Sequence, residues 1–234
     1  MGARDAAGFA RYAVYFTPEP GALADFGAAW LGWDSAAGVA RPHPDVPGLP
    51  APVEDLTARP RKYGFHGTIK PPFRLAPGTD ADDLRAALAT FCATAAPVML
   101  DGLRLARIGS FVALVPEGPA DALARCAAGA VEALDRFRAP LTAAEIDRRD
   151  PARLTDRQRQ MLARWGYPYT HADFRFHMTL TGPVGAQADA VCAALAPVVT
   201  PLIPRPFAVD ALTLLGADGQ DRFHQIARYP LGSG

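Results

Sequence analysis

Phe65-His66-Gly67-Thr68-Ile69 and Phe176-His177-Met178-Thr179-Leu180 are the two stretches that decide the fold of this chain. Each consists of an aromatic residue, a His-x-Thr motif and an aliphatic residue. Successive side chains of a β-strand point to opposite faces, so the histidine and the threonine of each motif share one face. We therefore expect two imidazoles and two hydroxyls, from separate strands, to converge on one small anionic group.

The same alternation assigns charged neighbours to the motif faces. Lys62 and Lys70 share a face with the first motif, and Arg175 shares a face with the second. These are the only two lysines among 24 Lys and Arg residues, and they flank the first motif symmetrically. They indicate either a cationic rim around an anion site or a chance result of an arginine-rich composition.

Paired histidines can perform both proton transfers that phosphodiester hydrolysis needs. Imidazole titrates near neutrality, so one ring can take a proton from water while the other protonates the leaving oxygen. Threonine hydroxyls can donate hydrogen bonds to the non-bridging oxygens, and a cation can stabilise their charge. The motifs therefore predict acid–base chemistry that requires no metal and no cofactor.

The order of predicted elements repeats after each motif as helix, strand, strand. The segments 98–105 and 207–214 share the pattern x-x-aliphatic-Asp-small-Leu-x-Leu, with Asp101 and Asp210 at the matching position. The offset from His66 to Asp101 is 35 residues, and that from His177 to Asp210 is 33. We interpret this as an internal duplication with halves at about 11–136 and 173–234, against the alternative of chance similarity between short apolar strands.

Residues 140–172 lie between the two halves and read as a helical insertion. Thr142-x-x-Glu145 and Thr155-x-x-Gln158 are both capping-box patterns, so they predict two short helices. The insertion is either a lid or wall of the substrate cleft or a packing appendage.

Composition narrows the class of protein. The chain has 234 residues, half of them hydrophobic, and a formal net charge of zero. This argues against an extended nucleic-acid-binding surface, which usually requires a basic face. The sequence contains no run of about 18 apolar residues, and Met1 to Ala10 lacks the pattern of a signal peptide. We expect a cytoplasmic, monomeric protein with no membrane partner.

The motif pair His66-Gly67-Thr68-Ile69 and His177-Met178-Thr179-Leu180 resembles the signature of the two-histidine (2H) phosphoesterase superfamily. The resemblance implies an α+β fold in one bilobal domain (residues 1–234), with pseudo-two-fold symmetry, antiparallel sheets lining a central cleft and helices outside. It implies His66 and His177 as the acid–base pair, with Thr68 and Thr179 as phosphate ligands. Gly67 departs from the hydrophobic residue usual there, which either loosens packing or lets the substrate approach closely.

The segments 11–16, 165–169 and 174–182 resemble a branch of this superfamily often encoded with phosphonate-degradation genes. That association suggests phosphoribosyl 1,2-cyclic phosphate as the substrate, with Lys70 and Arg175 as candidates for its second phosphate. Further candidate substrate-binding residues are Tyr15, Tyr63 and Tyr169, although Tyr15 could equally pack in the core. The alternatives are an RNA or nucleoside 2′,3′-cyclic phosphodiesterase and a non-catalytic nucleotide- or RNA-binding module.

Overall fold

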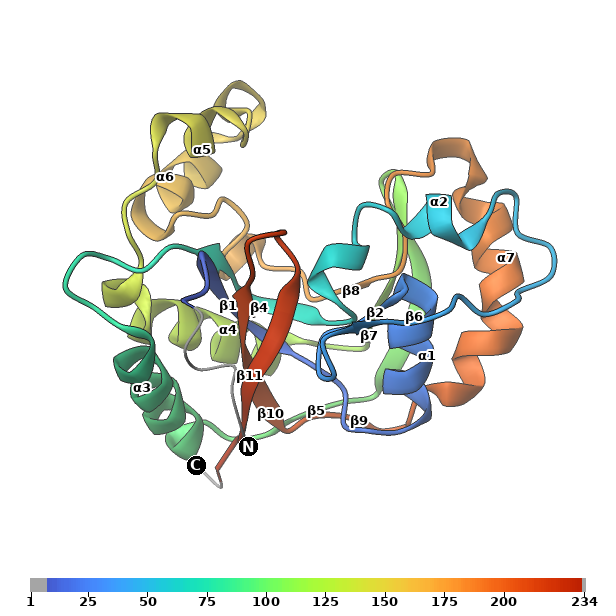
Figure 1. Cartoon of the computed structure of the whole chain (residues 1–234), viewed down its shortest axis with the longest axis horizontal. Coiled ribbons are helices and arrows are strands. Elements are labelled where there is room, and N and C mark those ends of the chain that lie inside the picture. The colour runs from blue at the N-terminus through green and yellow to red at the C-terminus, as the bar shows by residue number, and fades with distance from the viewer. Residues whose placement is uncertain (1–7, 233–234) are drawn as a thin grey trace.

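The computed structural model describes residues 8–232, and most of the segment on which the absence of a signal peptide was predicted lies outside this range. Its main sheet has seven strands in the order β11-β10-β1-β4-β8-β7-β6, and each neighbouring pair is antiparallel. The two motif strands, β4 (Gly67–Phe73) and β8 (Met178–Thr179), are adjacent at the middle of this sheet (Figure 1). The α+β class with antiparallel sheets is therefore confirmed.

The other strands extend the sheet on both sides of the motif pair. They are β1 (Arg11–Phe16), β6 (Gly102–Ile108), β7 (Phe111–Glu117), β10 (Ala211–Ala217) and β11 (Phe223–Pro230). Two small sheets pair β2 (Trp33–Asp34) with β3 (Val39–Ala40), and β5 (Val98–Leu100) with β9 (Phe207–Val209). Asp101 falls between β5 and β6, and Asp210 falls between β9 and β10, so the two aspartates occupy matching places in the element order.

The hairpins of the two halves are exchanged. The β6–β7 hairpin follows the first motif along the chain but extends the sheet beside β8. The β10–β11 hairpin follows the second motif and extends the sheet beside β1 and β4. Each side of the central motif pair is therefore built from both halves, and the pairing of β5 with β9 joins the halves again.

Seven α-helices lie among the described residues. They are α1 (Ala22–Leu31), α2 (Val53–Thr57), α3 (Ala81–Thr94), α4 (Asp121–Ala133), α5 (Ala143–Asp147), α6 (Asp156–Trp165) and α7 (Ala188–Val199). Both predicted capping boxes are present, with Thr142 and Thr155 accepting from the N3 backbone of α5 and α6. The N-cap of helix α3 is Asp80, whose carboxylate accepts from the Asp83 N–H, while the preceding Thr79 hydroxyl donates to the Ala76 carbonyl.

The two faces of the sheet have different roles. Val14 and Phe16 of β1, with Met178 of β8, pack in the main core beneath helices α1, α3, α4 and α7. Ala13 and Tyr15 alternate with them, so they face the opposite side, where Tyr15 packs against Phe223 in a smaller cluster. That opposite face carries the motif side chains.

The segment Gly185–Leu202, which contains α7, is long and apolar enough by length and composition alone to cross a membrane. The expectation that the sequence holds no such stretch is therefore wrong for this segment. In the fold, Val191, Leu195 and Val199 of α7 are fully buried, and α7 packs on β6 and β7.

Candidate active site

The register of β4 and β8 brings the two motifs together. Gly67 pairs directly with Met178, and both are buried on the helix side of the sheet. One step on either side of this antiparallel pair, His66 comes opposite Thr179 and Thr68 comes opposite His177, all on the open face. Each histidine therefore lies beside the threonine of the other motif as well as its own.

Both imidazoles are held in the same way. His66 Nδ1 lies 2.9 Å from the Gly64 carbonyl oxygen, and His177 Nδ1 lies 2.8 Å from the Arg175 carbonyl oxygen. A carbonyl can only accept, so Nδ1 carries the proton in each ring and Nε2 has a lone pair when the ring is neutral. In each motif the carbonyl belongs to the residue two positions earlier, so the same local device fixes the same tautomer twice.

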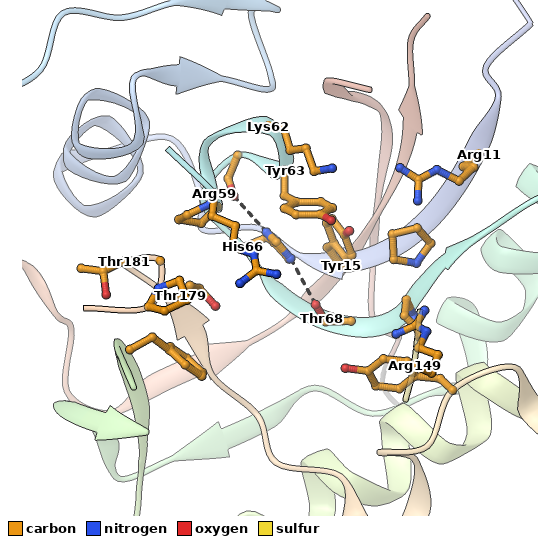
Figure 2. Close-up of a pocket in the computed structure, with 18 residues that line it drawn as sticks. Arg11, Tyr15, Arg59, Lys62, Tyr63, His66, Thr68, Arg149, Thr179 and Thr181 are labelled. Carbon is orange, nitrogen blue, oxygen red and sulfur yellow. Dashed lines mark hydrogen bonds between the residues drawn. The ribbon is translucent and has the colours of Figure 1, made fainter. Parts of the chain in front are cut away.

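His66 is the more enclosed of the two histidines. Its ring stacks on Tyr15 at a centroid distance of 3.7 Å, and its Nε2 lies 3.1 Å from the Thr68 hydroxyl (Figure 2). Burial lowers the pKa of His66 to about 4, while the bond to the Gly64 carbonyl opposes this shift and His177 adds to it. His66 is therefore neutral at physiological pH, and its Nε2 can accept a proton.

His177 lies in more open surroundings. Its ring packs near Phe111 at 5.6 Å, and within residues 8–232 no hydrogen bond to its Nε2 is found. His66 and His177 line two adjoining cavities, of about 510 and 520 Å³, which share Thr68 and Phe111 as lining residues. The motif residues thus lie where the two cavities meet.

The tyrosines predicted to bind substrate are all near these cavities. Tyr15 and Tyr63 line the cavity of His66, and the half-exposed Tyr169 lines that of His177. Tyr15 stacks on the ring of His66, so it both packs against a motif residue and lines the cleft. Arg175 lies at the rim beside His177 and donates through Nη1 to two nearby backbone carbonyls.

The prediction that Lys70 shares the motif face is wrong. Lys70 is 1% exposed, its Nζ donates to the Val131 carbonyl, and Asp135 lies 3.5 Å away. The cause is a β-bulge: β1 pairs Tyr15 with Thr68 but Val14 with Lys70, so one extra residue of β4 breaks the alternation. Lys70 therefore turns into the core and cannot reach the cleft.

Gly67 is explained by packing. A Cβ at this position would lie 2.3 Å from the ring of Phe176, which precedes the second motif. Gly67 is buried on the face opposite His66, so it does not open the site to substrate. The glycine makes room for an aromatic ring that supports the neighbouring motif strand.

The cleft has a cationic rim that the alternation rule did not locate. Lys62 belongs to it as expected, and Arg11, Arg59 and Arg149 complete it. The insertion 140–172 supplies Arg149 and Tyr167, so it forms part of the cleft wall. No sequence pattern connects these cations, since they come from distant segments that only the fold brings together.

No group of three or more His, Cys, Asp or Glu side chains that could hold a metal ion is found within the described range. The donor set of the cleft consists instead of imidazoles, hydroxyls and cationic side chains.

Two curated proteins are similar to this chain in sequence. It is 40% identical over 211 residues to a ribose 1,5-bisphosphate phosphokinase PhnN of Janthinobacterium sp. (strain Marseille), covering 87% of this chain and 47% of that protein. A protein of the same name from Laribacter hongkongensis (strain HLHK9) is 36% identical over 191 residues, covering 77% and 41%. The chain thus spans less than half the length of these relatives.

Solved structures align over nearly the whole chain at low identity. The apo form of E. coli LigT gives 17% identity and a TM-score of 0.45, covering 97% of this chain and 99% of that one. TT0787 of Thermus thermophilus gives 14% identity and a TM-score of 0.44, covering 96% and 100%.

A family model described as "Protein of unknown function (DUF1045)" matches residues 68–224, well over half of the sequence. The chain belongs to this DUF1045 family.

Proposed function

We propose that this protein hydrolyses a cyclic phosphodiester by two-histidine acid–base catalysis. The observation that carries the proposal is the matched pair of imidazoles, His66 and His177, on adjacent strands. Each ring has its Nδ1 tied to a carbonyl, so its neutral form offers an unprotonated Nε2 near the junction of two cavities, and that of His66 accepts from the Thr68 hydroxyl. Nucleotide or phosphate binding alone does not require two rings prepared for proton transfer, which disfavours a non-catalytic binding module.

The surroundings of the two rings suggest their roles. His66 is neutral, so its Nε2 takes a proton from water as the water oxygen attacks phosphorus. The bond from phosphorus to one ester oxygen then breaks, and His177, protonated at Nε2, gives that oxygen a proton. One water is consumed, the ring opens to a phosphate monoester, and solvent restores both histidines.

The threonines and a nearby cation would stabilise the transition state. Thr68 already lies within hydrogen-bonding distance of His66, and Thr179 lies opposite His66 across the strand pair. Their hydroxyls can donate to the non-bridging oxygens of the substrate. Arg59 is exposed and lines the same cleft, where its guanidinium can neutralise charge that builds on those oxygens.

A phosphorylated ribose is the substrate that best fits the relatives. Their printed name describes activity on ribose 1,5-bisphosphate, although this chain covers less than half of each. The chain contains no G-x-x-x-x-G-K-[ST] phosphate-binding loop, so we assign no phosphokinase activity to it. We propose phosphoribosyl 1,2-cyclic phosphate, an intermediate of phosphonate catabolism, as the cyclic ester that it opens.

A nucleoside or RNA 2′,3′-cyclic phosphate is the second candidate. The cleft is lined by the rings of Tyr63, Phe111 and Tyr167, and aromatic rings of this kind can stack on a nucleobase.

Hydrolysis followed by ³¹P NMR tests the proposal. Purified protein should open phosphoribosyl 1,2-cyclic phosphate faster than nucleoside 2′,3′-cyclic phosphates, and EDTA should leave the rate unchanged. The double variant His66→Ala/His177→Ala is the control for contaminating activity. A folded wild-type protein that is inert on both ester classes would contradict hydrolysis, and faster turnover of the nucleotides would favour the second candidate.

A further inference from the structure

The cleft contains more positive charge than a cyclic phosphodiester needs. Such an ester carries one negative charge, whereas Arg11, Arg59, Lys62 and Arg149 all line the cavity of His66. No aspartate or glutamate of the described range lines that cavity. Its volume of about 510 Å³ is also within the range of sites that hold a whole small molecule rather than a single anionic group.

The cations are divided around His66. Figure 2 shows Arg59 on the side of His66 toward Thr179, close in the view to the motif residues. Lys62 and Arg11 lie on the other side, in the direction of Tyr63, and Arg149 lies beyond Thr68. A substrate whose reacting ester lies between the motifs would therefore extend toward three further cations.

Arg149 is available to bind an anion. Its guanidinium lies over the ring of Tyr167 at 4.8 Å, and within residues 8–232 no hydrogen bond or salt bridge of this side chain is found. Stacking on a ring uses the face of a guanidinium and leaves its N–H edge free, which suits bidentate contact with a phosphate.

Arg11 and Lys62 are already positioned by one carboxylate. Both form ion pairs with Asp221, which lies in the turn between β10 and β11. Asp218 secures this turn by accepting from the backbone N–H groups of residues 220 and 222. Two cations share a single carboxylate, so the group retains a net positive charge for a ligand.

Phenol hydroxyls add neutral donors to the same region. Tyr63 and Tyr167 line the cleft, and burial raises the pKa of Tyr167, so its hydroxyl stays protonated. A phosphate monoester has several acceptor oxygens, and mixed cationic and hydroxyl donors can satisfy more of them than either kind alone.

We propose that Arg149, Arg11 and Lys62 form a second anion subsite that binds a phosphate monoester elsewhere on the substrate. The subsite rests on the proposed function for the location of the reacting ester. It assigns selection of doubly phosphorylated substrates to the insertion, through Arg149, instead of to Lys70 and Arg175.

A binding experiment with matched ligands tests this subsite. Ribose 1,2-cyclic phosphate, with and without a 5-phosphate, is titrated by calorimetry into the His177→Ala protein, so that turnover does not interfere. The 5-phosphate should increase affinity at least about tenfold, because hydrogen bonds to charged groups contribute about 1.5–3 kcal/mol. Adding Arg149→Gln should remove about tenfold of the affinity for the 5-phosphorylated ligand and less than about twofold for the other.

Arg148→Gln is the matched control, since Arg148 is the exposed neighbour of Arg149 and lines neither of these cavities. Among residues 8–232 its side chain donates only to the Ala144 carbonyl. This variant should change neither affinity. Equal losses for both ligands with Arg149→Gln, or no loss, would overturn the subsite, provided circular dichroism shows a folded protein. Because binding is measured without turnover, failure of the hydrolytic function would appear separately, as an inactive wild-type protein.

Discussion

The two motif strands carry the same His-x-Thr pattern but lie in different surroundings. His66 is stacked on Tyr15 and precedes a seven-residue strand that pairs with β1 and β8. His177 precedes a strand of only two residues and lies near Phe111, in a second cavity. Both rings nevertheless bond a carbonyl two residues earlier in the chain.

This comparison separates what the motif determines from what its surroundings determine. The local pattern fixes the tautomer and the direction of the ring, and these are equal in the two copies. Enclosure fixes the pKa, and it holds His66 in the neutral form. Duplicated motifs can therefore acquire different catalytic roles without any change in the motif itself.

The largest expected effect comes from removing each histidine in turn. His66→Ala and His177→Ala should each lower kcat/KM by about 10²–10⁴-fold, the usual contribution of a general acid or base. A nitrophenyl phosphodiester distinguishes the roles, because its leaving group departs without protonation. His177→Ala should recover most activity on this ester, and His66→Ala should not. The opposite pattern would reverse the assignment, and equal recovery would show that the two rings are interchangeable.

The acidic limb of the pH–rate profile tests the effect of enclosure. Below its pKa of about 4, His66 is protonated and cannot take a proton from water, so kcat/KM of the wild type should fall only near pH 4. Tyr15→Leu removes the stacked ring and admits water, which moves the pKa up toward its ordinary value near 6.5. At pH 5.5 the variant should therefore lose activity that the wild type keeps.

Tyr15→Phe is the control because it keeps the ring and removes only the hydroxyl. Its acidic limb should stay near that of the wild type. A limb that is unchanged in Tyr15→Leu would show that stacking does not set the pKa of His66.

The middle residues of the motifs offer a third comparison, this time of packing. Gly67→Ala places a Cβ against Phe176, and such overpacking costs about 1–3 kcal/mol of unfolding free energy. At the paired position, Met178→Leu nearly conserves volume and should cost less than about 1.5 kcal/mol. Urea denaturation of both variants measures the difference. Equal costs would mean that the Phe176 ring adjusts to an added methyl group.

The parts of the structure that sequence predicted are those governed by local rules. The Thr142 and Thr155 boxes begin their helices because each satisfies backbone groups within four residues. The second motif strand, β8, has only two residues because the register would place Pro71 opposite Phe174. Proline has no N–H to donate to the ladder, so regular pairing does not extend that far.

The parts that sequence missed depend on partners distant in the chain. The alternation of β4 changes at a bulge that exists only in its pairing with β1. The cationic rim joins β1, the region of Arg59 and Lys62, and the insertion, and no pattern of spacing relates these segments. The motif residues themselves could be predicted from the sequence, because the histidine and threonine of each motif lie two residues apart on one strand face.

The last comparison concerns the two lysines, which occupy opposite faces of the fold, and for Lys70 we expect no loss of activity. Lys70→Met replaces a buried ion pair with an apolar side chain, while Asp135 keeps its two hydrogen bonds from Arg138. Such replacements are often neutral or stabilising by about 1–4 kcal/mol, so Lys70→Met should raise or preserve the unfolding free energy without lowering turnover. Lys62→Met should instead leave stability unchanged and weaken binding of phosphorylated ligands.

The pH dependence of this difference identifies its cause. Burial lowers the pKa of Lys70 to about 8 in the folded state, against about 10.5 in the unfolded chain. Between these values the unfolded state binds more protons, so wild-type stability gains from rising pH through this residue. The advantage of Lys70→Met should therefore be largest below pH 8 and shrink toward pH 10.5. An advantage that does not vary with pH would mean that the lysine stem, and not its charge, causes the difference in unfolding free energy. A loss of turnover in Lys70→Met would mean that Lys70 contributes to catalysis after all.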